Sequence, residues 1–351
     1  MDKEKALIAM SGGVDSSVAG FLSKQEFNCI GATMLLCDGL TDTPANTDDA
    51  RSVAERLGIP FYVFDHTALF REKVVDTFIR CYEEGGTPNP CLYCNRHLKF
   101  DSLMQEAAAL GCKYVVTGHY AQIVQDPKSG RYLLKKAVDT SKDQSYFLSC
   151  LTQNQLSHAR FPLGGMPKTQ VREIAAEQGF VSAKKRDSQD ICFIPDGNYK
   201  AFMERYTGKQ YPAGNYLDPA GNIVGKHSGA VGYTIGQRKG LGLAMGEPVY
   251  VCCKDMEKNT VTVGSNEQLF RKELLATDWN WFPFDTLTEP IRIFARVRYR
   301  HTEQPATVYP LENGAAKVVF DEPQRAITPG QTVVLYDGDT VIGGGTITEV
   351  L

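Results

Sequence analysis

The segment Ser11-Gly12-Gly13-Val14-Asp15-Ser16-Ser17 has the residue types of a phosphate-binding loop and lies between an apolar run and a helical pattern. Its glycines allow a sharp turn and a close approach of the backbone to a ligand, and the amides that begin the next helix favour phosphate. The hydroxyls of Ser11, Ser16 and Ser17 would add donors, and Asp15 could help to hold Mg²⁺. An ordinary strand-to-helix turn is the alternative, but the residue order is more specific than that and favours ATP binding.

Cysteines in two separate stretches indicate sulfur or metal chemistry. Cys91 and Cys94 have Cys-Xaa-Xaa-Cys spacing just before a helical pattern, so Cys94 is predicted near a helix N-terminus, where a thiolate is stabilised. Cys192 follows much later in the chain. Because cytosolic cysteines are kept reduced, spaced cysteines among the ten in this chain indicate metal binding or catalysis more than structural disulfides. The other cysteines give no such signal: Cys29, Cys112 and Cys150 are predicted to be buried thiols, and Cys37 and Cys81 have no partner at a useful spacing.

Basic residues mark two candidate surfaces for an anionic partner. Alternation along the run 291–301 predicts one strand face that carries four arginines: Arg292, Arg296, Arg298 and Arg300. That face is either the solvated outside of a barrel or a ridge that contacts nucleic-acid phosphates. The run Lys184-Lys185-Arg186, before Cys192, is either a solvated charge run or a basic loop that suits an anionic substrate.

The elements that must position these residues alternate between strand and helix in the first half of the chain. This alternation predicts an α/β fold with a doubly wound parallel sheet. Strands are predicted at 6–10, 30–36, 61–64 and 114–117, and a hairpin joins 121–124 to 132–136. Helices are predicted at 16–25, 47–57, 68–84, 95–110, 144–151, 169–178 and 199–206.

The second half has a different composition, because Gly and Pro become frequent after about Gly208 and short β-rich runs replace helical periodicity. Such runs are typical of a small barrel or sandwich. Three domains are therefore predicted: an ATP-binding and catalytic domain over 1–207, a central β-rich linker domain over 208–274, and a C-terminal β-barrel over 275–351. A chain of 351 residues is long enough for two or three domains.

The overall composition is that of a soluble globular protein, with 42% hydrophobic and 23% charged residues. The apolar runs are too short to span a bilayer and no signal peptide precedes the first strand pattern, so a cytoplasmic protein without membrane contact is expected. The net charge of −3 excludes a general polycation. Any contact with nucleic acid must therefore come from local basic patches.

The loop 11–17 resembles the signature of the PP-loop ATP pyrophosphatase superfamily, whose members transfer AMP to a substrate oxygen and release pyrophosphate. It is not a Walker-type loop, because no Gly-Lys-Ser/Thr follows the glycines. Further motifs extend the resemblance along the chain to the tRNA-specific 2-thiouridylase family, also called MnmA or TrmU. These motifs are Thr87–Asn95, Thr117–Tyr120, Lys142–Leu148, Asp187–Ile194, Gly232–Gly242 and Thr328–Gln331. The resemblance implies a PP-loop (adenine nucleotide alpha hydrolase-like) domain, and ATP-dependent 2-thiolation of the wobble uridine of tRNA.

The resemblance also implies a role for individual residues. ATP would adenylate the C2 oxygen of the uridine, Cys192 would carry the sulfur as a persulfide, and Cys94 would be its partner cysteine. The matched ATP-contacting positions are Ala9, Met10, Ser11, Gly12, Gly13, Val14, Asp15, Ser16, Met34 and Gly118. The matched tRNA-contacting positions are Asn89, Pro90, Cys91, His119, Lys142, Asp143, Gln144, Arg298, Tyr299 and Gln331. The implied partners are a tRNA with a wobble uridine and a sulfur-donor or sulfur-relay protein.

Position 91 departs from the family pattern, because many members have Asn-Pro-Asp before the catalytic cysteine and this chain has Cys91. Thiolates of Cys91, Cys94 and Cys192 could hold an iron–sulfur cluster with one open iron, which would bind hydrosulfide. The sequence leaves open this cluster route, the route through a persulfide and a disulfide, and a structural zinc.

Two other functions are compatible with the phosphate loop alone. A PP-loop adenylating enzyme could act on a small-molecule substrate, but it would not need paired cysteines or a β-rich tail. A non-catalytic nucleotide- or RNA-binding module would keep its function without Asp15 or Cys192. For the thiolation reaction, the loop around Cys192 is expected to move, because adenylation must precede sulfur attack.

Overall fold

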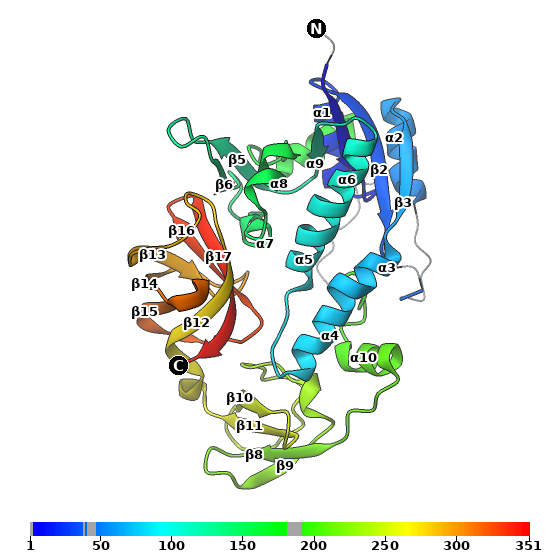
Figure 1. Cartoon of the computed structure of the whole chain (residues 1–351). Helices are drawn as coiled ribbons and strands as arrows, with labels where there is room; N and C mark the ends of the chain where they lie inside the picture. The colour runs from blue at the N-terminus through cyan, green and yellow to red at the C-terminus, as the bar shows by residue number, and fades with distance from the viewer. Residues whose placement is uncertain (1–2, 38, 41–46, 181–190) are drawn as a thin grey trace.

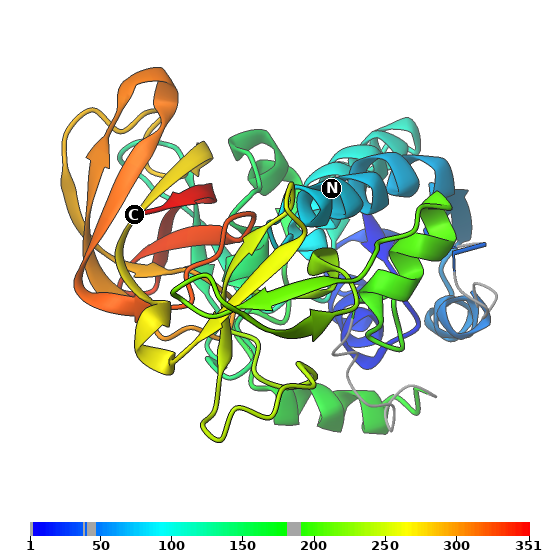
Figure 2. The same ribbon diagram turned by 90° about the horizontal axis from the view of Figure 1, so that it is seen from below.

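The computed structural model describes residues 3–37, 39–40, 47–180 and 191–351 of the chain. A parallel sheet covered by helices forms one end of the molecule, a small β-rich body forms the other, and a β-barrel lies to one side between them (Figure 1). The parallel sheet and its helices are called the first body. The view from below shows the small β-rich body in front, between the barrel and the helices of the first body (Figure 2). The basic run Lys184-Lys185-Arg186 lies outside the described residues.

The sheet of the first body has five parallel strands in the order β3-β2-β1-β4-β7. Their bounds are β1 Lys5–Ala9, β2 Asn28–Leu35, β3 Phe61–Asp65, β4 Tyr114–Val116 and β7 Ala159–Arg160. The predicted doubly wound parallel sheet is therefore confirmed. Only β7 is missing from the sequence prediction, because two residues give no periodic signal. The strand order reverses between β1 and β4, which is where such sheets bind ligands at the carboxyl ends of their strands.

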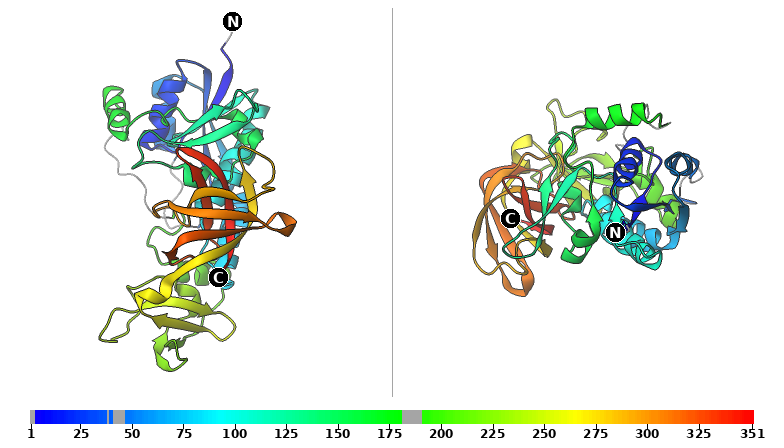
Figure 3. Two further views of the ribbon diagram at one scale, coloured as in Figure 1. Left: turned by 90° about the vertical axis from the view of Figure 1, so that its left-hand side faces the viewer. Right: turned by 90° about the horizontal axis from the view of Figure 1, so that it is seen from above.

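Helices cover both faces of this sheet and extend from it toward the small β-rich body (Figures 1 and 3). They are α1 Val14–Ser23, α2 Asp48–Leu57, α3 Thr67–Phe70, α4 Asp76–Glu83, α5 Pro90–Tyr93, α6 Leu103–Ala109, α7 Ser145–Leu148, α8 Gln153–His158, α9 Lys168–Glu177 and α10 Tyr199–Thr207. π-Helical turns at Arg71–Val75 and Cys94–Ser102 join α3 to α4 and α5 to α6. Short 3₁₀ turns lie at Ala230–Gly232, Asn266–Leu269 and Glu312–Gly314.

The helix that was predicted to begin at residue 95 begins at Pro90. The side-chain oxygen of Asn89 accepts a hydrogen bond from the backbone amide of Cys91 at 3.2 Å, so Asn89 is the N-cap. Pro90 occupies the first helical position, where proline needs no amide partner. The pattern Asn-Pro is therefore a helix start, and both Cys91 and Cys94 lie within the helix.

The barrel closes through six strands, because β12 pairs with both β15 and β17. The strands are β12 Phe270–Trp281, β13 Ile291–Arg296, β14 Gln304–Pro310, β15 Ala316–Arg325, β16 Thr332–Asp337 and β17 Thr340–Val350. The predicted hairpin is also present, as β5 Ala121–Gln125 and β6 Tyr132–Lys136. Its strand β6 pairs with β17 through Lys135 and Thr340, so the hairpin of the first body extends a barrel sheet.

The small β-rich body is a four-stranded sheet in the order β10-β11-β8-β9. Its strands are β8 Gly214–Leu217, β9 Ile223–His227, β10 Tyr250–Asp255 and β11 Thr260–Gly264. Tyr216, Val251 and Val261 are fully buried in its core. Within the described ranges, no helix has the length and apolar character needed to cross a membrane.

The predicted ridge of four arginines is wrong. The inward residues alternate as expected, but β13 ends at Arg296, so Arg298 and Arg300 lie in the turn that follows. Arg292 forms a two-pronged ion pair with Asp321 on the barrel surface. Proximity in sequence therefore does not place these guanidinium groups on one face.

Candidate active site

The predicted phosphate loop joins β1 to α1 at the point where the strand order reverses. Gly12 has a φ of +72°, and a Cβ there would come within 2.6 Å of a side-chain atom of α2, so the turn requires glycine. Helix α1 begins without a side-chain cap, which suits a site where its first amides meet phosphate. The hydroxyls of Ser16 and Ser17 donate to the Gly13 carbonyl at 3.1 and 2.8 Å. Because Ser17 is fully buried, it holds the loop, and its predicted role as a phosphate donor is wrong.

Asp15 lies in the first turn of α1 and is the acceptor of a small polar cluster. Its carboxylate accepts hydrogen bonds from Lys168 Nζ at 2.7 and 2.8 Å and from the Tyr120 hydroxyl at 2.7 Å. Lys168 begins α9 and is only 7% exposed, so its ammonium group needs this partner. The carboxylate is therefore neutralised by a lysine, and it is not presented as an open ligand for Mg²⁺. The sequence analysis missed Lys168, whose position beside a predicted helix start is not a specific signal.

Gly118 brings the end of β4 against the start of α1. A Cβ on Gly118 would lie 2.7 Å from the carbonyl carbon of Asp15 and 2.8 Å from the amide nitrogen of Ser16, so this contact also requires glycine. Met10 is buried at the end of β1 and Met34 is half-buried in β2. The predicted ATP-contacting positions, which run from Ala9 to Ser16 and add Met34 and Gly118, thus follow or end neighbouring strands at the carboxyl edge of the sheet.

His119 follows Gly118 and lies against aromatic rings. Its Nδ1 is 2.7 Å from the Thr117 hydroxyl, and its ring centroid is 5.8 Å from those of both Phe100 and Phe161. Burial among these groups lowers the pKa of His119 well below its ordinary value of 6.5, and the nearby Lys99 lowers it further. The imidazole is therefore neutral at neutral pH, which suits hydrogen bonding rather than ion pairing with phosphate.

Cys91 and Cys94 lie one turn apart on the helix that begins at Pro90. Cys94 is buried, and burial raises the pKa of its thiol to about 11. Because the helix begins at Pro90, Cys94 lies a full turn beyond the predicted N-terminal position, and burial opposes formation of its thiolate. The Cys91 side chain is exposed in the first helical turn, but desolvation by its neighbours also raises its pKa.

Cys192 lies in the turn before α10 and meets a cysteine that the sequence analysis left without a partner. Its Sγ forms a hydrogen-bonded contact with the Sγ of Cys37 at 4.0 Å, and the 155 residues between the two explain why no sequence spacing indicated this pair. A Cys37 thiolate would accept a hydrogen bond from the Cys192 thiol. This contact lowers the pKa of Cys37 and raises the pKa of Cys192, because a second negative charge beside the first is unfavourable.

The positive charge of one lysine, Lys99, acts on all three of the predicted reactive thiols. Burial raises the pKa of the Cys91 and Cys94 thiols, and the contact with Cys37 raises that of Cys192; the positive charge of Lys99, on the π-helical turn Cys94–Ser102, partly offsets the rise in all three. The Cys94 thiol is in turn affected by the charges of Cys192 and Cys91, so the three sulfur atoms lie in one neighbourhood. The sequence analysis missed Lys99, which belongs to no recognisable motif.

The metal-binding prediction fits the geometry less well. Among the described residues, which include Cys91, Cys94 and Cys192, no group of three or more His, Cys, Asp or Glu side chains is placed to hold a metal ion. The three thiols share a neighbourhood, but they do not form a ready set of cluster ligands.

The predicted tRNA-contacting residues Gln331, Arg298 and Tyr299 lie where the barrel meets the first body. Gln331 Nε2 donates to the carbonyl oxygen of Thr87 at 2.8 Å, just before the helix that begins at Pro90. The Tyr299 ring is 4.4 Å from that of Phe147 in α7, and Arg298 donates to a backbone carbonyl of the barrel at 2.8 Å.

The predicted run Lys142–Gln144 is mixed in its exposure. Asp143 is 4% exposed and accepts hydrogen bonds from the amides of Ala137 and Ser145 at 3.0 and 3.2 Å, so its carboxylate orders the loop from within. Gln144 accepts a hydrogen bond from the Tyr120 amide at 2.9 Å, and Lys142 is half-buried. Asp143 can therefore affect a ligand only by positioning its neighbours.

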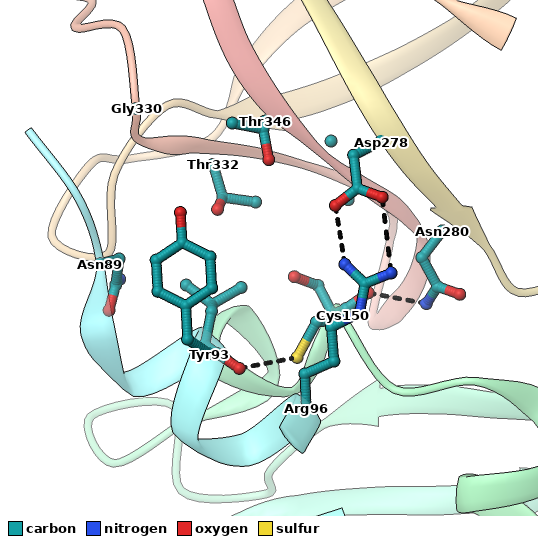
Figure 4. Close-up of a pocket in the computed structure, with 13 residues that line it drawn as sticks. Asn89, Tyr93, Arg96, Cys150, Asp278, Asn280, Gly330, Thr332 and Thr346 are labelled. Carbon is teal, nitrogen blue, oxygen red and sulfur yellow. Dashed lines mark hydrogen bonds and ion pairs between the residues drawn. The ribbon is translucent and has the colours of Figure 1, made fainter. Parts of the chain in front are cut away.

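The helix that begins at Pro90 and carries Cys91 and Cys94 is called the cysteine helix. A small polar cavity lies between it and the barrel (Figure 4). Arg96 and Asp278 form an ion pair across it at 2.7 Å, and the Tyr93 hydroxyl points toward the barrel residues Thr332 and Gly330. Its volume of about 40 Å³ is far below that of a ligand pocket, which is typically about 300–1,000 Å³. The cavity is therefore too small for a nucleotide, and its polar side chains join the helix to the barrel.

Comparisons with known proteins cover almost the whole chain. Family models match in order: the tRNA methyl transferase HUP domain at residues 4–196, the tRNA methyl transferase PRC-barrel domain at 200–265, and the aminomethyltransferase beta-barrel domain at 271–347. Proteins named tRNA-specific 2-thiouridylase MnmA are similar over their full length. The protein from Clostridioides difficile (strain 630) is 49% identical over 99% of both chains. The one from Acetivibrio thermocellus is 49% identical over 99% of this chain and 100% of its own.

Proposed function

The chain belongs to the tRNA-specific 2-thiouridylase family, and we propose that it thiolates the C2 position of the wobble uridine in tRNA at the expense of ATP. The enzyme class is a tRNA-uridine 2-sulfurtransferase. Its relatives share the whole length of the chain, including the barrel. This shared architecture disfavours the two alternative functions, which are a PP-loop enzyme that adenylates a small-molecule substrate and a non-catalytic nucleotide- or RNA-binding module.

The proposal is supported by contacts that lead from the phosphate loop toward the thiols. Gly118 touches the backbone of the phosphate loop at Asp15. The next residue is His119. The positive charge of Lys99 affects the pKa of His119 and also that of the Cys94 and Cys192 thiols. A substrate atom that is activated by ATP at this loop would therefore lie near the sulfur donors.

The first step is activation of the uridine. The amides at the start of α1 and the Ser11 hydroxyl bind phosphate oxygens, and the C2 oxygen of the uridine attacks the α-phosphorus of ATP. A bond forms between that oxygen and phosphorus, and pyrophosphate leaves. Adenylation turns a poor leaving group into a good one. Lys168 neutralises Asp15 beside the phosphate loop, so that the carboxylate does not repel the phosphates, and the neutral imidazole of His119 would hydrogen-bond the uridine.

The second step replaces oxygen by sulfur. Cys192, which is exposed, carries a persulfide that a sulfur-donor or relay protein has loaded. Cys94 attacks the inner sulfur, the outer sulfur leaves as hydrosulfide, and a Cys94–Cys192 disulfide forms. Hydrosulfide then adds to C2 and AMP departs. Cys94 must leave its buried position for this attack, which agrees with the expected movement around Cys192.

The cofactor assignments beyond ATP follow the same geometry. Mg²⁺ accompanies ATP in the proposal, but Asp15 could bind it only by releasing Lys168. A cluster on Cys91, Cys94 and Cys192 would require these side chains to rearrange, so we favour the persulfide route. The proposed cytoplasmic location would keep these thiols reduced between turnovers.

A nucleoside digest tests the function. Unmodified tRNA is incubated with the protein, ATP, Mg²⁺ and a persulfide donor, and 2-thiouridine is quantified by mass spectrometry. We expect the product with the unaltered chain and with Cys253→Ser, which removes an exposed thiol of the small β-rich body. Cys192→Ser should abolish it. Absence of 2-thiouridine from every reaction would contradict the proposal.

The sulfur route is tested separately by anaerobic purification, visible absorption and an iron assay. The persulfide route predicts a colourless, iron-free protein that is fully active, and Cys91→Ser should then retain activity. An iron-dependent activity that is lost in Cys91→Ser would support the cluster instead.

A further inference from the structure

Cys37 and Cys192 form a pair of thiols at the active edge of the sheet, although 155 residues separate them in sequence. Their sulfur atoms are 4.0 Å apart. Cys37 follows β2, so it lies at the same carboxyl edge as the phosphate loop after β1 and His119 after β4. Cys192 is exposed and Cys37 is half-buried, so reagents can reach the pair.

The turn that carries Cys192 is anchored by the residue that follows it. Phe193 is 1% exposed and packs edge-on against Phe70 and Phe78, with ring centroids 5.6 and 5.3 Å apart. An aromatic side chain held in this way fixes the local backbone. The buried ring of Phe193 therefore anchors the turn in which the exposed Cys192 meets Cys37.

The partner that the family resemblance implies for Cys192 is less accessible in this arrangement. Cys94 is buried inside a helix. In the part of the chain that the structure describes, a sulfur hydrogen bond joins Cys192 to Cys37, and none joins it to Cys94 or Cys91. Two sulfur atoms at 4.0 Å need to approach by about 2 Å to bond, a distance within reach of side-chain rotation.

On the basis of the proposed function, we propose that Cys37 is a second resolving thiol that attacks the Cys192 persulfide. Cys37 loses its proton and attacks the inner sulfur of Cys192, and a bond forms between the two Sγ atoms. The bond to the outer sulfur breaks, and that sulfur leaves with the electron pair as hydrosulfide. The outer sulfur gains two electrons as the two cysteines are oxidised to a disulfide, so the step needs no external oxidant.

The Cys37 route delivers hydrosulfide at the edge of the sheet where the uridine is activated, without extraction of Cys94 from the core. The Cys37–Cys192 disulfide must be reduced before the next turnover, and a cellular dithiol is the reductant class that does this by thiol exchange. Reduction returns both thiols and allows a new persulfide to be loaded.

The test follows the step without tRNA or ATP. Reduced protein is treated with inorganic polysulfide and desalted. Hydrosulfide release is then measured with a fluorogenic probe, and disulfides are mapped by mass spectrometry without reduction. We expect a peptide that joins Cys37 to Cys192, together with released hydrosulfide. In Cys37→Ser and Cys37→Ala, hydrosulfide release should fall at least about tenfold while the Cys192 persulfide persists.

Two further variants sharpen the result. Cys94→Ser should still release hydrosulfide and form the Cys37–Cys192 peptide, and Cys253→Ser should match the unaltered protein. Release that is unchanged in Cys37→Ser, or a cross-link from Cys192 to Cys94 alone, would overturn the inference.

A separate digest for 2-thiouridine distinguishes this inference from the proposed function. If thiolation proceeds but no Cys37–Cys192 peptide forms, only the role of Cys37 fails. If the peptide forms but no 2-thiouridine appears, the proposed function fails and the reactive pair remains.

Discussion

Lys99 lies within electrostatic reach of Cys91, Cys94 and Cys192, and its charge partly offsets the burial and the Cys37 contact that raise the pKa of these thiols. Lys99→Met keeps the apolar stem and removes the charge, so we expect fewer thiolates at pH 8. An interaction of about 0.5–1 kcal/mol with a partly exposed charge corresponds to alkylation by iodoacetamide that is about 2–5-fold slower.

The alkylation rate of Cys192 is read by mass spectrometry of the labelled peptide. Lys73→Met is the matched control. This exposed lysine pairs with Glu72, and both residues lie in the π-helical turn Arg71–Val75. Equal rates in the two variants would show that Lys99 does not tune these thiols.

The ion pair between Lys168 and Asp15 makes a prediction about ATP. Lys168→Met leaves the carboxylate of Asp15 without its counter-charge beside the phosphate loop, so ATP binding should weaken through repulsion. We expect KM for ATP to rise about tenfold or more in a pyrophosphate-release assay, which corresponds to about 1.4 kcal/mol. Lys113→Met, which removes an exposed lysine paired with Glu4, should leave KM unchanged. A normal KM in Lys168→Met would mean that the pair is only structural.

The role of a residue could be predicted from the sequence where that role depends on its immediate neighbours in the chain. The turn at Gly12 and the approach at Gly118 follow from short contiguous motifs, and the structure places both at the same edge. Lys99, Lys168 and Cys37 act through partners far away in the chain, so no spacing in the sequence reveals them.

At the scale of elements, Gln331 links the barrel to the cysteine helix. Its amide donates to the carbonyl oxygens of Thr87 and Pro88 at 2.8 and 3.4 Å, directly before the cap at Asn89. Gln331→Leu removes both contacts, and we expect a loss of about 1 kcal/mol in urea unfolding. The rate of 2-thiouridine formation should fall more than the rate of pyrophosphate release, because the cysteine helix is displaced while the phosphate loop is intact.

The control for this variant is Gln125→Leu, which removes an exposed amide contact on the hairpin. A parallel fall in both reactions, or in neither, would contradict the proposed role of the Gln331 contact.

The elements that the sequence predicted well are those with a long repeating pattern. Four of the five sheet strands and the hairpin were found in this way. The start of the cysteine helix was missed because Asn89 and Pro90 resemble a turn, whereas cap and first-turn positions favour these two residue types. The end of β13 at Arg296 was missed because apolar alternation continues into the turn as far as Val297.

At the scale of the whole molecule, several histidines predict acid sensitivity. Burial is the main cause that lowers the pKa of His97, His119, His227 and His301 below 6.5. The unfolded chain therefore binds protons that the folded chain excludes, and stability falls as pH drops below 6.5. The lowered carboxylate pKa values, as at Asp321, add a further loss only at lower pH.

We expect the urea midpoint to decrease between pH 7.5 and pH 5.5. His119→Gln should flatten this dependence. A midpoint that is constant from pH 7.5 to pH 5.5 would contradict the assignment.

The pairing of β6 with β17 has a consequence for synthesis on the ribosome. Lys135 emerges early, but its partner Thr340 is near the end of the chain, and roughly 200 residues at about 5–20 per second separate them by about 10–40 s. During this interval the nascent hairpin presents an unpaired strand to its surroundings. The free edge of β6 can therefore be covered by β17 only after Thr340 has been synthesised, and until then it is open to chaperones and to other nascent chains.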